Sequence, residues 1–319
     1  MDSVHSLRQT HLPQFKNGLD FDLLLSHALH RPKEFLYSHD DYSPTKPELN
    51  RFQKYSRLYH TGYSIAAIIQ HKEFYGLDFF VNKHVLVPRP ETELLVEHAI
   101  KAANIAPSPA RLAVATHGET QARGEVRRGG SNHPIILIDV GTGSGSIPIS
   151  ILKKTSQKIN KTFAIDISSR ALTVAKKNAR THSVLITFLH GNLLKPLLKN
   201  NLTIQQFNNL TLLITANLPY LTAAQFKSEP SVQKEPRIAL VAKNSGLELY
   251  EKLLKQIKRL LFSIDCCLLT CLLEIDPSQT KPIQQLIKTI LPKGQVKILK
   301  DLAGLDRVVM IEIKQRLSS

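Results

Sequence analysis

The fold of this chain is decided by residues 135–145, which read Ile135-Ile136-Leu137-Ile138-Asp139-Val140-Gly141-Thr142-Gly143-Ser144-Gly145. The short apolar run at the start of this stretch is typical of a strand that is buried on both faces. Glycines at alternate positions after the strand let the backbone turn sharply and approach a ligand closely. An apolar segment follows at residues 147–152. The stretch therefore predicts a strand, a ligand-binding loop and a helix.

An acidic residue follows this loop at the distance expected for a nucleoside ligand. Phe163-Ala164-Ile165 predicts the next strand, and Asp166 ends it 21 residues after Gly145. A carboxylate at the end of that strand can accept both hydroxyl groups of a ribose. The loop has the pattern G-x-G-x-G and not the dinucleotide pattern G-x-G-x-x-G. It thereby resembles the S-adenosylmethionine loop of class I methyltransferases. This resemblance implies S-adenosylmethionine as the cofactor, and it implies that Asp139 lies near the amino-acid end of that cofactor.

A second motif, Asn217-Leu218-Pro219-Tyr220, follows the apolar run at residues 212–216. An Asn side-chain oxygen and a nearby backbone carbonyl can accept both N–H groups of a planar nitrogen, such as an aromatic amine or a carboxamide. A Tyr ring can pack against the planar group. The alternative is an ordinary turn at a strand end, since Asn and Pro are common in turns. Downstream of a cofactor loop, the motif predicts methyl transfer to a planar nitrogen.

Length and composition set the bounds of the interpretation. The chain has 319 residues, more than a single domain usually contains, so we expect one large and one small domain. Apolar residues make up 42% of the chain, which is enough for a sizeable core. No apolar run approaches the roughly 20 residues that span a bilayer. The first residues lack the apolar core of a signal peptide, and we expect a cytoplasmic protein without a membrane segment. His27 and His30 lie one helical turn apart without a third ligand, so we expect no metal site.

The net charge of +16 is the other unusual bulk property. Such a charge can indicate nucleic acid, a ribosome-associated partner or an acidic protein surface. The lysines are dispersed, several of them at helical spacing, and Trp is absent. We therefore favour a solvated surface over a specific nucleic-acid groove, and contact with nucleic acid remains possible but is not required.

Three regions are expected along the chain. Residues 1–70 are predicted to form a helical bundle, and residues 71–92 a β-hairpin linker that turns at Gly76. Residues 93–319 alternate between strand-like and helix-like segments, which predicts a parallel α/β sheet. Within this last region, residues 107–134 contain few large apolar side chains and are predicted to be an inserted loop. Residues 295–300 and 307–313 predict a hairpin that closes the sheet.

Four further segments resemble one family, the release-factor glutamine methyltransferases (HemK/PrmC family). The longest is Val85-Leu86-Val87-Pro88-Arg89-Pro90-Glu91-Thr92-Glu93-Leu94-Leu95-Val96-Glu97. The others are Glu73-Phe74-Tyr75-Gly76, Glu235-Pro236-Arg237-Ile238-Ala239-Leu240 and Leu302-Ala303-Gly304-Leu305-Asp306-Arg307. They occur in the order of the family, and the resemblance covers nearly all of the chain.

The resemblance implies a fold and a substrate. The fold is a class I S-adenosylmethionine-dependent methyltransferase with a Rossmann-like seven-stranded sheet, a small N-terminal helical bundle and a β-hairpin linker. The substrate is the glutamine in the Gly-Gly-Gln motif of class I peptide chain release factors. The implied cofactor-binding residues are Asp139, Gly141, Thr142, Gly143, Ser144, Gly145, Asp166, Asn192, Leu193 and Asn217. Asn217, Leu218, Pro219 and Tyr220 would bind the substrate, and Asn217, Pro219 and Tyr220 are the catalytic candidates.

The implied reaction is a direct in-line displacement by the amide nitrogen. Asn217 Oδ1 and the Leu218 carbonyl would accept its two N–H groups, Tyr220 would hold the amide plane and Pro219 would set the turn. No dedicated general base is required, because the nitrogen-bound proton becomes acidic once the methyl is transferred.

Two positions depart from the family pattern, and they leave rival functions open. Asn192 stands where the family usually has Asp, and its side-chain oxygen can still accept from an adenine amine. Leu218 replaces the first Pro of the usual Asn-Pro-Pro-Tyr turn, which removes some rigidity. Asn-Leu-Pro-Tyr also resembles the turn of rRNA adenine dimethyltransferases. An adenine-specific rRNA or DNA methyltransferase is therefore the first alternative, and a non-catalytic S-adenosylmethionine-binding module is the second.

Overall fold

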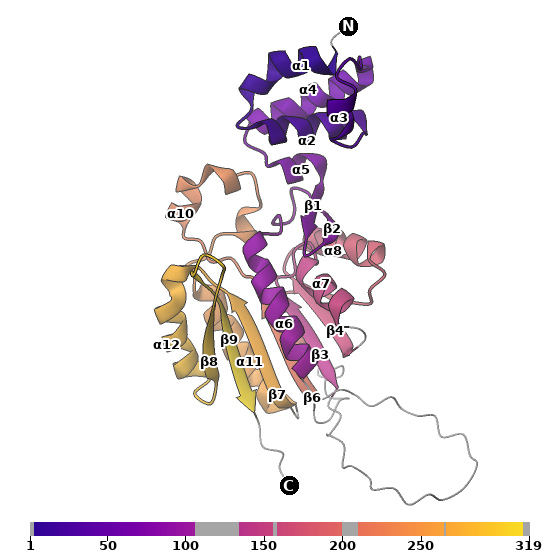
Figure 1. The fold of residues 1–319 in the computed structure, drawn as a ribbon. Helices are drawn as coiled ribbons and strands as arrows, with labels where there is room; N and C mark the ends of the chain where they lie inside the picture. Colours follow the sequence, from indigo (N-terminus) through magenta and orange to yellow (C-terminus); the bar gives the residue numbers. More distant parts are fainter. Residues whose placement is uncertain (1–2, 106–133, 156–157, 200–209, 265, 315–319) are drawn as a thin grey trace, which may run out of the picture.

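The N-terminal region of the computed structural model is helical (Figure 1). The structure describes residues 3–105, 134–155, 158–199, 210–264 and 266–314. The helices are α1 (Val4–His11), α2 (Gly18–Leu29), α3 (Phe35–Ser38), α4 (Lys46–His60) and α5 (Ile65–Ile69). Their apolar faces meet in one core, in which Phe21 and Phe52 pack edge to face at 5.5 Å. The sequence predicted a bundle here, although helix α1 lies ahead of the periodic segments on which that prediction rests.

A β-hairpin connects this bundle to the rest of the chain. Strand β1 (His71–Phe74) pairs antiparallel with β2 (Leu77–Phe80), and Phe74 is opposite Leu77. The two residues between them, Tyr75 and Gly76, both have positive φ, as the favoured two-residue hairpin turns require. The predicted hairpin that turns at Gly76 is therefore confirmed.

The remainder of the described chain is built on a seven-stranded sheet with the order β5-β4-β3-β6-β7-β9-β8. Its strands are β3 (Ile135–Val140), β4 (Ile159–Asp166), β5 (Thr187–His190), β6 (Leu210–Ala216), β7 (Cys266–Glu274), β8 (Gln295–Lys300) and β9 (Asp306–Lys314). Strands β3 to β7 run parallel, while β9 is antiparallel to both of its neighbours. The parallel sheet and its closing hairpin are as predicted.

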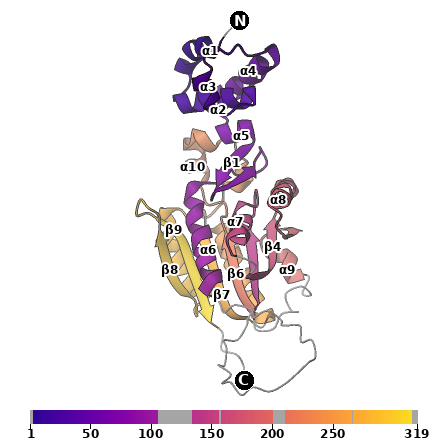
Figure 2. The same ribbon diagram turned by 45° about the vertical axis from the view of Figure 1, so that its right-hand side comes forward.

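Helices cover both faces of this sheet (Figures 1 and 2). Alternate residues of β3 belong to two separate cores, as the period of two in a strand requires. Ile135 and Leu137 face α6 (Glu93–Ile105), α7 (Ser146–Lys154) and α8 (Ser169–Thr181). On the other face lie α9 (Lys195–Lys199), α11 (Glu248–Ser263) and α12 (Thr280–Ile290). Helix α10 (Ala223–Ser228) lies beyond the strand ends. Every strand from β3 to β7 thus has apolar cover on both sides.

The order of the strands places a crevice at the carboxyl ends of β3 and β6. The chain passes from β3 to β4 on one side and then returns to β6 on the other, and ligands bind at such a reversal in open α/β sheets. The helical bundle lies beyond this edge (Figure 1).

The predicted insertion at 107–134 falls almost entirely outside the described residues, and the division of the chain at residues 70 and 92 stays a prediction. Among the described residues, no helix is long and apolar enough to cross a membrane.

Candidate active site

The glycine-rich loop leaves β3 with its backbone in conformations that side chains disfavour. Gly141 has a φ of +76° and Gly145 a φ of +80°. A Cβ atom on Gly141 would lie 2.9 Å from Leu218 Cδ2, so the loop and the Asn217 turn are in direct contact. On Gly145, a Cβ atom would lie 3.1 Å from Ile149 Cδ1 in the helix that follows. The two glycines let the loop pack closely against both neighbours.

Asp166 at the end of β4 is held by main-chain donors. Its Oδ2 accepts the N–H of Gly143 at 2.9 Å, and its Oδ1 accepts the N–H of Ser168 at 2.8 Å. Burial raises the pKa of the Asp166 carboxyl, and these backbone N–H groups oppose that shift. The carboxylate is therefore fixed beside the loop, with acceptor capacity left for a ligand hydroxyl.

Asp139 lies beneath the loop. It is fully buried, and its Oδ1 accepts the hydroxyl of Thr215 on β6 at 2.7 Å. Burial raises the pKa of Asp139 to about 6, against the effect of the Thr142 and Thr215 hydroxyls. Its Oδ2 accepts no well-formed hydrogen bond from the described residues. Asp139 supports the loop from below and does not line the cavity above it.

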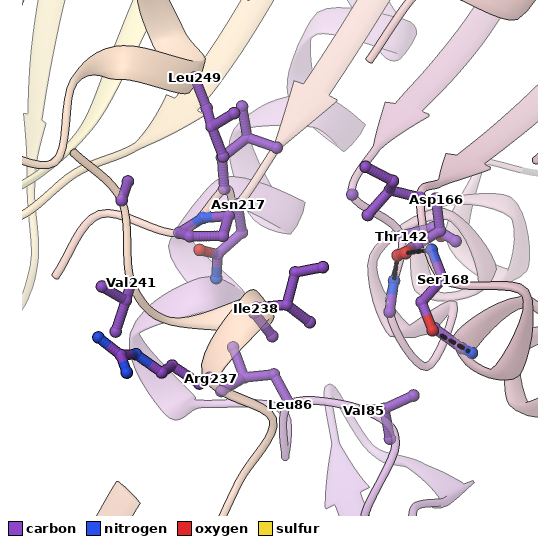
Figure 3. Close-up of a pocket in the computed structure, with 18 of the residues that line it drawn as sticks. Val85, Leu86, Thr142, Asp166, Ser168, Asn217, Arg237, Ile238, Val241 and Leu249 are labelled. Atoms are coloured by element: carbon purple, nitrogen blue, oxygen red, sulfur yellow. Dashed lines mark hydrogen bonds between the residues drawn. The ribbon is translucent and has the colours of Figure 1, made fainter. Parts of the chain in front are cut away.

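A cavity of about 860 Å³ opens above the loop. Most of the residues that the sequence predicted for the cofactor line it: Gly141, Thr142, Gly143, Ser144, Asp166, Asn192, Leu193 and Asn217. Figure 3 shows the Asn217 side chain projecting into it from the end of β6, while Thr142 and Asp166 gather on the other side. Gly145 directly precedes α7 and, like Asp139, is absent from the cavity wall. Residues far apart in the sequence are thus brought around one space.

The Asn217 turn is anchored by contacts that the sequence did not predict. Asn217 Nδ2 donates a hydrogen bond to Thr92 Oγ1 at 3.1 Å, and the Thr92 residue is only 3% exposed. Leu218 is buried, and its carbonyl oxygen lies 3.4 Å from the hydroxyl of Tyr250 on α11. The Tyr250 hydroxyl donates its proton to the Glu274 main-chain carbonyl, so the lone pairs of the Leu218 carbonyl stay available to a substrate donor. Leu218 is therefore a packed core residue as well as a source of a carbonyl group.

Tyr220 faces a second, smaller cavity of about 360 Å³. Asn217, Leu218 and Arg89 line both cavities, so the two spaces meet at the turn. The Tyr220 hydroxyl lies 3.5 Å from Glu274 Oε1 at the end of β7. Burial raises the pKa of the Tyr220 hydroxyl, and the neighbouring Glu274 carboxyl raises it further. Tyr220 is therefore a neutral hydrogen-bond donor across the physiological range.

Two of the motif segments hold each other in place above the cavities. The Glu235 carboxylate accepts the Val87 backbone N–H at 3.0 Å and pairs with the Arg89 guanidinium. A buried carboxylate that is satisfied by a backbone amide and an arginine fixes its neighbours firmly. The sequence matched both segments to the family without predicting this contact, and it assigned no role to Thr92 or Tyr250. For Glu274, the only indication in the sequence that it could lie at the site was its position at the end of a predicted strand.

Comparisons with known proteins agree with this geometry. A family model described as a methyltransferase domain matches residues 132–299. A release factor glutamine methyltransferase of Enterococcus faecalis is 33% identical over 79% of this chain and 76% of the relative. The chain belongs to the release factor glutamine methyltransferase family. A member from Dictyoglomus turgidum is 29% identical over 92% of this chain and 90% of the relative.

A solved structure confirms the fold. The catalytic domain of hMettl16, in complex with MAT2A 3'UTR hairpin 1, superimposes with a TM-score of 0.52 and 14% identity. The match covers 86% of this chain and 82% of that one. The predicted class I methyltransferase fold and the predicted family are therefore both confirmed.

Membership of this family makes the protein an S-adenosylmethionine-dependent methyltransferase. The residues present fit that cofactor. A Cβ atom on Gly141 would lie 2.9 Å from Leu218 Cδ2 and narrow the cavity, and the Asp166 carboxylate on the cavity wall can accept hydroxyl groups of a ligand. The Asn192 side chain offers both a donor and an acceptor on the cavity wall. The assignment of each residue to a part of the cofactor remains a prediction from the sequence.

Proposed function

We propose that the protein methylates the side-chain amide nitrogen of the glutamine in the Gly-Gly-Gln motif of class I peptide chain release factors. The observation that carries the proposal is the position of Asn217 on the walls of both cavities. A methyl donor in the larger cavity and a glutamine side chain in the smaller one would meet at this residue. The relatives named above are release factor glutamine methyltransferases, and this supports the same substrate here.

The chain's own residues orient the amide and accept its protons. S-adenosylmethionine supplies an electrophilic methyl group when it is bound. Asn217 Oδ1 and the Leu218 carbonyl accept the two N–H groups of the substrate amide, which fixes the direction of the nitrogen lone pair. Positive charge develops on this nitrogen as the reaction proceeds, and the two oxygen dipoles stabilise it. Pro219 holds the backbone of the turn, and the Tyr220 ring lies beside the smaller cavity where the amide would enter.

The N-terminal region is the proposed site of release-factor recognition, and the cytoplasm is the proposed location. The bundle lies beyond the carboxyl ends of the parallel strands (Figure 1), and Asn217 at the end of β6 lines both cavities. Lys234, one residue before Glu235, places its ammonium nitrogen 5.7 Å from the centre of the Tyr63 ring and so connects the bundle with the segment that holds Arg89. A protein substrate that presents a loop to the cavity would contact the bundle at the same time.

Incubation with labelled S-adenosylmethionine tests the proposal. The substrates are a purified class I release factor, the same factor with the motif glutamine replaced by alanine, rRNA and DNA. We expect label only in the release factor that keeps its motif glutamine. Label in rRNA or DNA, with none in the factor, would favour the adenine methyltransferase to which the Asn217-Leu218-Pro219-Tyr220 turn is also suited.

A further inference from the structure

The orientation of the Asn217 carboxamide is fixed by a neighbour outside the turn. Thr92 belongs to the short 3-10 helix Pro90–Thr92 ahead of α6, and its Oγ1 accepts the Asn217 Nδ2 hydrogen bond. This bond leaves Oδ1 as the carboxamide atom that can accept from a substrate amide. In the reverse orientation Nδ2 would face the substrate, and two N–H donors would then oppose each other.

A threonine hydroxyl can support either orientation, because it can accept from Nδ2 or donate to Oδ1. Its choice depends on where its own proton goes. The Thr92 hydroxyl lies beside the Glu274 carboxyl and lowers the pKa of that group. Glu274 is 2% exposed, and its Oε2 accepts no well-formed hydrogen bond in the described part of the chain. An ionised carboxylate accepts only, so its presence beside Thr92 favours the orientation in which the Thr92 hydroxyl proton faces Glu274 and Oγ1 accepts from Asn217.

We propose that Thr92 and Glu274 are positioning residues that keep Asn217 Oδ1, and not Nδ2, directed at the substrate amide. The proposal rests on the proposed function of Asn217 and deepens it. The three side chains come from the 3-10 helix Pro90–Thr92, from β7 and from the end of β6, and the proposed relay runs from carboxylate to hydroxyl to carboxamide. Thr92 lines the larger cavity and Glu274 the smaller one, and both act on the reaction through the orientation of Asn217.

The charge state of Glu274 controls this relay. Burial raises the pKa of Glu274 to about 7, the nearby Glu91 also raises it, and the Thr92 hydroxyl and the Arg307 guanidinium oppose the shift. Tyr220 adds a neutral hydroxyl on the turn side, and the Tyr250 hydroxyl of α11 donates to the Glu274 main-chain carbonyl. A protonated Glu274 is able to donate a hydrogen bond to Thr92 Oγ1. The Thr92 hydroxyl then turns its own hydrogen toward Asn217. Turnover at saturating cofactor should therefore rise as the pH increases through about 7.

Thr92→Val and Thr92→Ser are a matched pair for the test. Valine keeps the shape of threonine and loses the hydroxyl, while serine keeps the hydroxyl and loses the methyl group. With a purified release factor as substrate, we expect Thr92→Val to lower kcat by about 100-fold, the cost of a misplaced reacting group. We expect Thr92→Ser to stay within about 5-fold of the wild type, because its hydroxyl restores the bond. The dissociation constant for S-adenosylmethionine, measured by calorimetry, should change little in both variants and reports that both are folded.

Glu274→Gln supplies the second readout. Glutamine does not titrate, so the rise of kcat around pH 7 should be absent in this variant and present in the wild type. The relay would be overturned by wild-type turnover in Thr92→Val or by equal losses of kcat in Thr92→Val and Thr92→Ser. A pH profile of kcat in Glu274→Gln that matches the wild type would overturn it as well. A wild-type protein that binds S-adenosylmethionine but does not methylate the factor would instead overturn the proposed function, and the relay with it.

Discussion

The two sides of the larger cavity are built in different ways. The cofactor side, defined as residues 141–145 with Asp166, is held by backbone groups: positive φ angles in the loop and main-chain N–H donors on the carboxylate. The turn side, defined as residues 217–220 with Thr92 and Glu274, is held by side chains that reach across the fold. Backbone contacts follow from a local sequence, whereas side-chain contacts follow from how distant segments meet. The first side can therefore be found from a motif, and the second needs the structure.

Removal of the Asn217 side chain should distinguish the roles of the two sides most clearly, because it affects methyl transfer and leaves cofactor binding nearly unchanged. Asn217→Ala deletes the acceptor that orients the substrate amide, and we expect kcat to fall by about 1,000-fold, as for the loss of a preorganised group at a developing charge. Binding of S-adenosylmethionine should remain within a few-fold of the wild type, because the cofactor side keeps its loop and carboxylate. Single-turnover methylation and calorimetry measure the two effects. Unchanged methylation would remove Asn217 from the mechanism.

The converse change acts on the cofactor side. Asp166→Ala removes a charged acceptor, and such hydrogen bonds contribute about 1.5–3 kcal/mol, so we expect cofactor affinity to fall by about 100-fold. At saturating cofactor, kcat should recover most of its wild-type value. Titration calorimetry checks the affinity, with Asp41→Ala, at an exposed position of the bundle, as the control. A loss in kcat that no cofactor concentration restores would show that the two sides are not separable.

The contrast also explains how much of the molecule the sequence could predict. The run Ile135–Ile138 and its alternating glycines indicated the strand, the loop and the helix, because each depends on neighbours in the chain. Asn217 was found because its turn is a contiguous motif. The bond from Asn217 to Thr92 joins residues 125 positions apart, and the one from Val87 to Glu235 spans 148 positions. The contact from Asn217 to Thr92 depends on the packing of α6 against β6 and β7, and no local pattern specifies either contact.

Leu218 is where the two sides touch, so its truncation should weaken the whole structure. Leu218 is 3% exposed and belongs to the same apolar core as Tyr250. Leu218→Ala should lower the free energy of unfolding by about 2.5 kcal/mol, near the low end for a buried leucine because the site borders a cavity. Chemical denaturation measures this change, and Leu185→Ala is the control because Leu185 is 95% exposed. Equal small losses in both variants would mean that Leu218 contributes only its backbone.

The last prediction concerns what the turn side costs in stability. Glu274 has a folded-state pKa of about 7 against an ordinary value of 4.5, so between these two values the folded protein holds a proton that the unfolded chain has released. Its contribution to stability is therefore full below pH 4.5 and falls as the pH rises through 7. Glu274→Gln does not titrate, so its stability relative to the wild type should increase by on the order of 2 kcal/mol between pH 5 and pH 8. Urea denaturation at both pH values measures this, with the exposed Glu73→Gln as control. A stability difference that does not change with pH would mean that Glu274 keeps one charge state throughout, and the turn side would then be as fixed as the cofactor side.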